Sequence, residues 1–276
     1  MKCSPSEITL DQRSRDLRRL VIRAIAAARR GHVGSSFSLI EMLRVLYDDV
    51  LRFDPKNPQW SQRDRCILSK GHGCLALYAL LADKGFFPVE ELDKFCKPDG
   101  ILGGHPERHK VPGVEASTGS LGHGLPIGVG MALNARMEKA NYRVFVVGSD
   151  GESQEGSVWE AAMAAAHHKL GHLTVLLDYN KQQSYGTIAE VLGLEPLSEK
   201  WRSFGFAVTE VNGHDVAELR DVVARVPLEP QKPTCIICHT IKGKGVRMCE
   251  GNLKWHHKTK ISDEEIQALY DGLEAA

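Results

Sequence analysis

The sequence predicts a doubly wound α/β fold, in which helices cover both faces of a mostly parallel sheet. Short apolar runs that end in polar or glycine turns alternate along the chain with helical patterns, as they do in βαβ units. The composition, 42% hydrophobic and 25% charged, is typical of a chain that buries a large core. No repeat or Pro/Ser-rich linker marks a boundary, so we expect a single domain over residues 1–276.

The N-terminal region predicts two helices separated by a turn. Apolar residues at spacings of three and four predict a helix over 10–30, which Gly31 ends. Ser38 and Glu41 form a capping-box pattern, which predicts that the second helix begins beyond the turn 31–36.

The next region predicts a strand, a helix and a long loop. The apolar run 66–68 predicts a strand that leads through a glycine-rich turn into a helix over 75–81. Residues 97–126 are rich in Gly, Pro and His without periodicity, which is typical of a functional loop, and a helix over 127–139 follows. The remaining elements are predicted as strands 144–147, 173–177, 207–211 and 234–238, and helices 157–168 and 215–226.

Charge and cysteine content exclude several classes of protein. Lys+Arg and Asp+Glu both number 35, so the chain carries no overall attraction for nucleic acid or an anionic membrane. The sequence has no signal-peptide pattern and no 18-residue uncharged apolar run, which predicts a cytoplasmic protein. Its seven cysteines are odd in number and scattered, so we expect free thiols in a reducing compartment.

Polar side chains follow two of the predicted strands and suggest a metal site. Asp150 comes after strand 144–147 and Asn180 after strand 173–177, so both lie at one sheet edge if these strands are neighbours. Oxygen ligands of this kind suit Mg²⁺ or Ca²⁺ together with phosphate oxygens. Gly151 allows a phosphate to approach the backbone closely. The helix predicted to start near Ser157 could direct its positive end toward the same point. Taken singly, Asp150 could be a helix cap and Asn180 a turn residue.

A zinc site and a dinucleotide site are less consistent with the sequence. Cys235 and Cys238 have a zinc-like spacing, but residues three apart on a strand point to opposite faces. The glycine-rich turn 119–124 lacks the acidic residue that a dinucleotide fingerprint requires.

Four histidines lie in loops where a packing role is hard to imagine. They are His32, His72, His105 and His256. A single loop histidine is usually a solvated surface residue, but four beside a metal and diphosphate site suggest a pocket that handles hydroxyl and carbonyl groups. Lys242 and Lys244 are either solvated or attract the diphosphate or a substrate phosphate.

The segment GSDGESQEG, followed by LDYN, resembles the signature of thiamine diphosphate enzymes. That resemblance implies that Asp150, Asn180 and the carbonyl of Gln182 bind the metal. A wider set of motifs over about residues 20–260 resembles the diphosphate-binding, N-terminal subunit of transketolase: RRGHVG, SKGHG, GGHPE, STGSLGHG, SDGESQEG, LDYNKQ and HTIKGKG…KWHHK.

The resemblance to transketolase implies roles for particular residues. The implied catalytic residues are His32, His72, His105, His256 and Glu155, of which Glu155 is expected to reach across a subunit interface. The implied cofactor-binding residues are His72, Gly119, Ser120, Leu121, Gly151, Glu152, Asn180 and Lys242. Ser149 and His123 depart from the family pattern, which has Gly and Gln at these places.

The implied activity is transfer of a two-carbon ketol unit from a ketose, by default a sugar phosphate, to an aldose through a dihydroxyethyl adduct of thiamine diphosphate. In this family an essential glutamate lies on a pyrimidine-binding domain, which we expect on a partner chain in an α2β2 assembly. The alternatives are a thiamine diphosphate enzyme for a specialised sugar or a 2-oxo acid, and a non-catalytic scaffold subunit.

Overall fold

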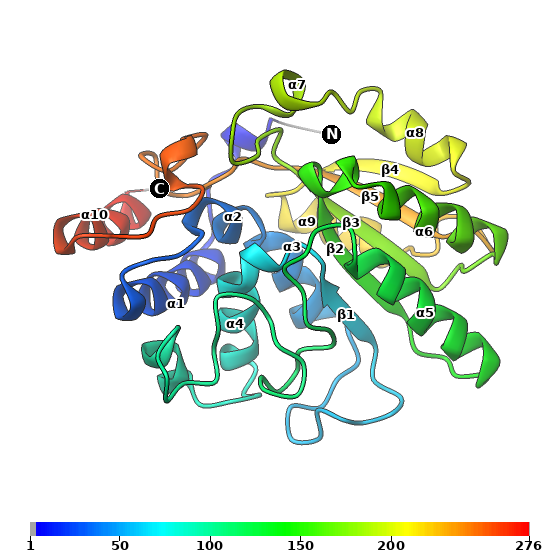
Figure 1. Ribbon diagram of the computed structural model, residues 1–276, viewed down its shortest axis with the longest axis horizontal. Helices are drawn as coiled ribbons and strands as arrows, with labels where there is room; N and C mark the ends of the chain where they lie inside the picture. Colours follow the sequence, from blue (N-terminus) through cyan, green and yellow to red (C-terminus); the bar gives the residue numbers. More distant parts are fainter. Residues whose placement is uncertain (1–3, 276) are drawn as a thin grey trace.

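The computed structural model describes residues 4–275, and residues 1–3 and 276 of the predicted domain lie outside the described part. Five parallel strands form one sheet in the order β1-β2-β3-β5-β4 (Figure 1). They are β1 (Arg65–Leu68), β2 (Val144–Ser149), β3 (Leu173–Tyr179), β4 (Ala207–Asn212) and β5 (Thr234–His239). The predicted parallel α/β fold is confirmed, and β2 and β3 are neighbours.

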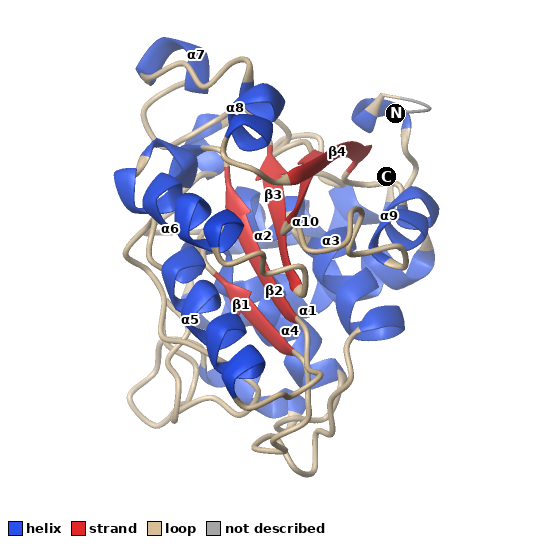
Figure 2. Ribbon diagram, turned by 90° about the vertical axis from the view of Figure 1, so that its right-hand side faces the viewer, coloured by secondary structure: helices blue, strands red, loops and turns tan. Residues whose placement is uncertain are grey.

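Helices cover both faces of this sheet (Figure 2). One face carries α5 (Gly124–Met137), α6 (Gly156–His167) and α8 (Leu197–Ser203). The other carries α1 (Gln12–Ala28), α3 (Ile40–Val45), α4 (Cys74–Asp83) and α9 (Val216–Val223), and α10 (Asp263–Glu274) packs on α1. Successive strand residues alternate between two cores: Val146 belongs to the core with α5 and α6, whereas Phe145 and Val147 belong to the core on the other face. The doubly wound fold is therefore held by two separate hydrophobic cores.

The predicted turn 31–36 is wrong, because α2 (Val33–Ser38) occupies most of it. The predicted capping box also fails: α3 has no side-chain cap, and the Ser38 hydroxyl instead donates to the carboxylate of Asp178, 2.6 Å away. The Ser38 hydroxyl therefore does not cap the helix, because it makes a tertiary hydrogen bond to Asp178, which lies far along the chain. Sequence patterns also missed α7 (Ile188–Val191), α8 and α10.

The two cysteines of β5 point to opposite faces of the sheet, as the alternation of strand residues predicts. Cys235 packs in the core beneath α5 and α6, and Cys238 packs in the core on the other face. Within residues 4–275 all six cysteines are free thiols, and no three His, Cys, Asp or Glu side chains are grouped to hold a metal. In the same range no helix is long and apolar enough to span a bilayer.

A buried ionic network joins α1, α3 and the loops after β4 and β5. Arg18 donates to both carboxylate oxygens of Glu41, and each residue is 0% exposed. His214 accepts from the Ile241 backbone N–H at its Nε2, so its Nδ1 carries the proton that it donates to Glu41 over 2.8 Å. Burial opposes ionisation of Glu41, but Arg18 and His214 hold its pKa well below the ordinary value.

We predict that Glu41→Gln destabilises the fold, because it leaves the Arg18 guanidinium buried without a countercharge. Removing one partner of a buried ion pair costs about 3–5 kcal/mol. Urea unfolding measures the loss. The matched control is Glu274→Gln, which removes an exposed partner of Arg19 and is expected to leave the unfolding midpoint nearly unchanged. Equal midpoints for the two variants contradict the prediction.

Candidate functional site

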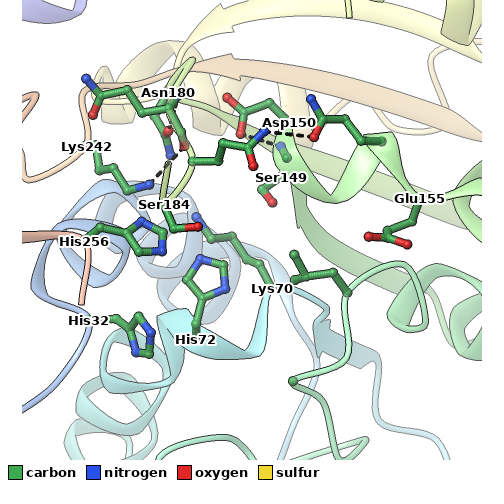
Figure 3. Close-up of a pocket in the computed structure, with 16 residues that line it drawn as sticks. His32, Lys70, His72, Ser149, Asp150, Glu155, Asn180, Ser184, Lys242 and His256 are labelled. Atoms are coloured by element: carbon green, nitrogen blue, oxygen red, sulfur yellow. Dashed lines mark hydrogen bonds between the residues drawn. The ribbon is translucent and has the colours of Figure 1, made fainter. Parts of the chain in front are cut away.

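A cavity opens at the carboxyl ends of β2, β3 and β5 (Figure 3). It brings together most of the side chains that the sequence singles out, although their motifs are spread over the whole chain. The predicted residues that line it are His32, His72, Gly119, Leu121, Asp150, Gly151, Glu155, Asn180, Gln182, Lys242 and His256. Sequence reasoning did not assign roles to five other lining residues, which are Lys70, Ser149, Gln154, Gln183 and Ser184.

Three predicted residues do not line this cavity. His105 and Ser120 line an adjoining hollow that also contains His123. Glu152 is 3% exposed and lies beneath the loop that carries Gly119 and Leu121, where it accepts a hydrogen bond from the Gly122 N–H at 2.8 Å. In this position Glu152 holds the loop and does not face the cavity.

The Asp178 carboxylate lies beneath the cavity and has four side-chain partners. It forms a fully buried ion pair with Lys70 and accepts hydrogen bonds from Thr240, Ser38 and the Asn180 side-chain amide. Burial opposes ionisation of Asp178, but Lys70 and these donors hold its pKa below the ordinary value. Sequence analysis missed both charged residues. The sequence signal that could have identified Asp178 is its place in the LDYN segment, two residues before Asn180.

Three oxygen groups at the ends of β2 and β3 form a donor set for a hard cation. The Asp150 carboxylate accepts from the backbone N–H groups of Gly151 and Lys181, at 2.8 and 2.6 Å. Asn180 uses its amide nitrogen on Asp178, while its oxygen accepts from the Gln182 N–H at 3.1 Å. The Gln182 carbonyl also lies at this cavity and accepts from the Lys242 ammonium at 3.0 Å. Carboxylate, amide and carbonyl oxygens are the ligands that Mg²⁺ and Ca²⁺ prefer.

The electrostatics of Asp150 fit a bound cation. The carboxylate is 1% exposed, and burial together with the nearby Asp178 raises its pKa to about 7, against the opposing effect of Lys70. An ionised Asp150 is therefore costly unless a further positive charge reaches it. A divalent cation held by Asp150, Asn180 and Gln182 supplies that charge, so the residues fit a metal.

Two buried ammonium groups stand on the cavity wall and favour an anion. Lys70 and Lys242 are 1% and 3% exposed, so Lys242 is not a solvated surface lysine. Burial and Lys70 lower the pKa of Lys242 to about 8, although Asp150 and Asp178 oppose this shift. Lys244 is also buried but lines a different hollow. Of the two lysines that the sequence singled out, Lys242 and Lys244, only Lys242 is placed to meet a diphosphate in the cavity.

Imidazoles form the opposite wall of the cavity (Figure 3). The ring of His32 lies 5.4 Å from that of His72 and 5.8 Å from that of His256, between centroids. His257, which sequence analysis did not single out, stacks on His32 with centroids 4.4 Å apart. The ring of His105 lies 6.2 Å from that of His32, so it borders the cluster from the adjoining hollow.

Burial favours the neutral form of three of these imidazoles, those of His32, His72 and His256. Burial, reinforced by the nearby His257, lowers the pKa of His32 to about 3, and burial with Lys242 lowers that of His256 to about 3. Burial also lowers the pKa of His72 well below its usual value. A neutral imidazole offers one donor and one acceptor, which suits recognition of hydroxyl and carbonyl oxygens.

A backbone bridge holds the two ends of this wall together. Gly31 and Lys258 exchange two antiparallel hydrogen bonds, with N···O distances of 2.9 and 3.1 Å. This contact fixes His32 and His256 beside each other, although they are far apart in the sequence.

Comparisons with known proteins give one family. A sequence model of the family described as "Transketolase, thiamine diphosphate binding domain" matches residues 11–274. The chain is 42% identical to the 6-deoxy-6-sulfo-D-fructose transketolase subunit SqwG of a Clostridium species, over 98% of both chains. It is 41% identical to an apulose-4-phosphate transketolase subunit of Phocaeicola vulgatus, over 95% of this chain and 92% of the relative.

Solved structures give the same result. Transketolase of Pichia stipitis superposes with a TM-score of 0.88 at 30% identity, over 94% of this chain. Transketolase of Campylobacter jejuni superposes with a TM-score of 0.88 at 30% identity, over 96% of this chain. The chain spans 40% and 43% of the length of those two proteins.

We predict that divalent metal binds more weakly as the pH falls below about 7, because the proton on Asp150 then competes with the cation. Each pH unit below that value weakens binding by about tenfold when one ligand must lose one proton. Titration with Mn²⁺, followed by electron paramagnetic resonance, measures the affinity. Asp150→Asn is the control and is expected to bind weakly without this pH dependence. A flat profile in the unaltered protein contradicts the prediction.

Proposed function

The chain belongs to the transketolase family, as its thiamine diphosphate-binding domain, and from this premise we propose that it is the diphosphate-binding subunit of a two-chain transketolase. The complex moves a two-carbon ketol unit from a ketose to an aldehyde acceptor. The observation that carries the proposal is one cavity in which oxygen ligands, two buried ammonium groups and a cluster of neutral imidazoles face one another.

We propose that the metal and diphosphate bind at the ends of β2 and β3. Asp150, Asn180 and the Gln182 carbonyl hold Mg²⁺, or Ca²⁺ in its place, and Lys242 neutralises part of the diphosphate charge. The loop with Gly119, Ser120 and Leu121 borders the aminopyrimidine, and Glu152 supports this loop from beneath. When bound, thiamine diphosphate supplies the electron sink for cleavage of the bond next to the substrate carbonyl.

The chain's own contribution to the chemistry is to orient the sugar and to hold protons. His32, His72 and His256 remain uncharged, so each can donate to one substrate oxygen or accept from one hydroxyl. The Nδ1 atom of His256 is buried and has no hydrogen-bond partner within residues 4–275. A hydroxyl of the bound ketose can supply that partner. We expect His105 to act on the substrate from the adjoining hollow.

Two observations support a partner subunit. The relatives at 42% and 41% identity are named as transketolase subunits and match this chain over nearly their whole length. Met137 on α5 and Met163 on α6 are 79% and 55% exposed, as expected for a surface that a second chain covers. We propose an α2β2 assembly in which Glu155, exposed at the cavity rim, reaches the partner and the partner carries the pyrimidine-binding domain.

The names of the relatives favour an anionic sugar as the substrate. One relative is named for a sulfonated ketose and another for a ketose phosphate. We therefore propose a ketose with an anionic tail. A pentose phosphate is the simplest member of this class, and a specialised sugar is equally compatible. Because five of the six described cysteines are buried free thiols, we place the complex in the reducing cytoplasm.

The central experiment uses the chain together with its partner subunit, isolated by pull-down from the native host. With thiamine diphosphate and Mg²⁺, we expect ketol transfer from xylulose 5-phosphate, 6-deoxy-6-sulfofructose or apulose 4-phosphate to an aldehyde. Activity should require both chains and disappear in Asp150→Ala, because that variant lacks the charged metal ligand. Glu274→Ala, at an exposed position at the end of α10, should retain it.

Three other outcomes separate the alternatives. Acylation of a lipoyl protein without ketol transfer identifies a 2-oxo acid enzyme. Binding of the partner without metal-dependent cofactor binding identifies a scaffold subunit. The departures from the family pattern at Ser149 and His123 are the features that suggest this alternative. The Ser149 hydroxyl accepts a hydrogen bond from the Glu152 N–H at 3.3 Å, so serine is accommodated at this turn. Absence of both partner and cofactor binding refutes the two-chain enzyme.

We predict that His256→Ala lowers kcat/KM for the ketose about tenfold, the equivalent of about 1.4 kcal/mol, because one hydrogen bond to an uncharged hydroxyl is lost. Steady-state kinetics on the two-chain complex measures the change. Affinity for thiamine diphosphate should stay within about twofold of the unaltered complex, since His256 faces the substrate. Loss of cofactor affinity with unchanged kcat/KM contradicts this role.

A further inference from the structure

The Gln182 carbonyl belongs to a compact loop, residues 181–192, that is braced from within. The Gln183 N–H donates to the Gly186 carbonyl at 3.0 Å, and the Ile188 N–H donates to the Lys181 carbonyl at 2.9 Å. Thr187 and Glu190 form a reciprocal capping box around α7. These contacts brace the loop as one unit, and its orientation decides where the Gln182 carbonyl points.

Contacts near the metal ligands anchor one side of this loop. The Lys181 N–H donates to Asp150, and the Gln182 side-chain amide donates to the Gly251 carbonyl at 2.9 Å. Ile188 is 4% exposed and inserts into the core beneath α5 and α6. The rest of the loop has less apolar anchorage, because Tyr185 is 89% exposed and Leu192, at the end of the loop, is 57% exposed.

A single side chain ties the far side of the loop to the turn that follows β2. Gln154 accepts from the Gln183 side-chain amide at 2.9 Å and donates to the Leu192 carbonyl at 2.5 Å. Gln154 belongs to a short 3₁₀ turn, Gly151–Gln154, that begins directly after Asp150. In addition to the contact between Lys181 and Asp150, this glutamine joins the two segments that carry metal ligands, and it bridges the loop at two points.

We propose that Gln154 is a positioning residue of the metal site, which clamps the loop 181–192 so that the Gln182 carbonyl faces Asp150 and Asn180. The inference rests on the proposed function for the identity of the metal ligands. The clamp itself stands on the two hydrogen bonds of the Gln154 side chain. A residue that supplied only local packing would not couple the turn after β2 to both arms of the loop.

The test measures metal affinity in the two-chain complex with Mn²⁺ alone as the probe. Gln154→Ala removes both hydrogen bonds, and we expect Mn²⁺ affinity to fall about tenfold. Gln183→Ala removes one of them and should cost about threefold. Gln267→Ala is the matched control, because this α10 glutamine hydrogen-bonds to the exposed Asp271, on the same helix and away from the cavity.

Hydrogen exchange of the loop amides provides a readout that does not depend on metal. In Gln154→Ala, the amides of residues 181–192 should exchange about tenfold faster than in the unaltered protein. The exchange rates of amides in the sheet should stay unchanged. Unchanged Mn²⁺ affinity, or unchanged exchange in the loop, overturns the clamp. Failure of the unaltered complex to bind Mn²⁺ refutes the proposed function instead, and the exchange comparison separates the two failures.

Discussion

The buried ion pair between Lys70 and Asp178 is the interaction on which the site depends. Removing two charges from water costs several kcal/mol per ion, which is offset only if each group finds further partners. Asp178 meets that condition through Ser38 on α2, Thr240 after β5 and Asn180 after β3. One carboxylate thereby fixes four segments relative to one another.

The charges around the cavity explain why its imidazoles and its metal ligands coexist. Burial, reinforced by Lys70 and Lys242, lowers the pKa of His72 and His256, whereas Lys70 offsets only in part the effect of burial and of Asp178 on the pKa of Asp150. In the proposed site a cation lies beside Asp150 and an anion beside Lys242, and their opposite charges favour each other's binding. The uncharged histidines are left free to recognise hydroxyl groups.

Much of the fold and part of the site could be predicted from the sequence. Each strand was located from the sequence, and the signal was strongest for β2, β3 and β5, because strands buried on both faces are nearly continuous in hydrophobic residues. Asp150 and Asn180 stood out at strand ends, although their proximity requires β2 and β3 to be neighbours, which the sequence did not establish. Lys70 was missed since a loop lysine is normally solvated. Ser38 was misassigned because its true acceptor, Asp178, lies far along the chain.

The bridge between Gly31 and Lys258 has a consequence for how the molecule folds. His32 and His256 meet only when the two ends of the chain close on each other, after every strand of the sheet has been synthesised. Contacts this distant in sequence form late and slowly, because loop-closure entropy opposes them. Cofactor capture must then follow completion of the sheet. Ligand binding selects fully folded chains from incomplete ones and stabilises them by mass action.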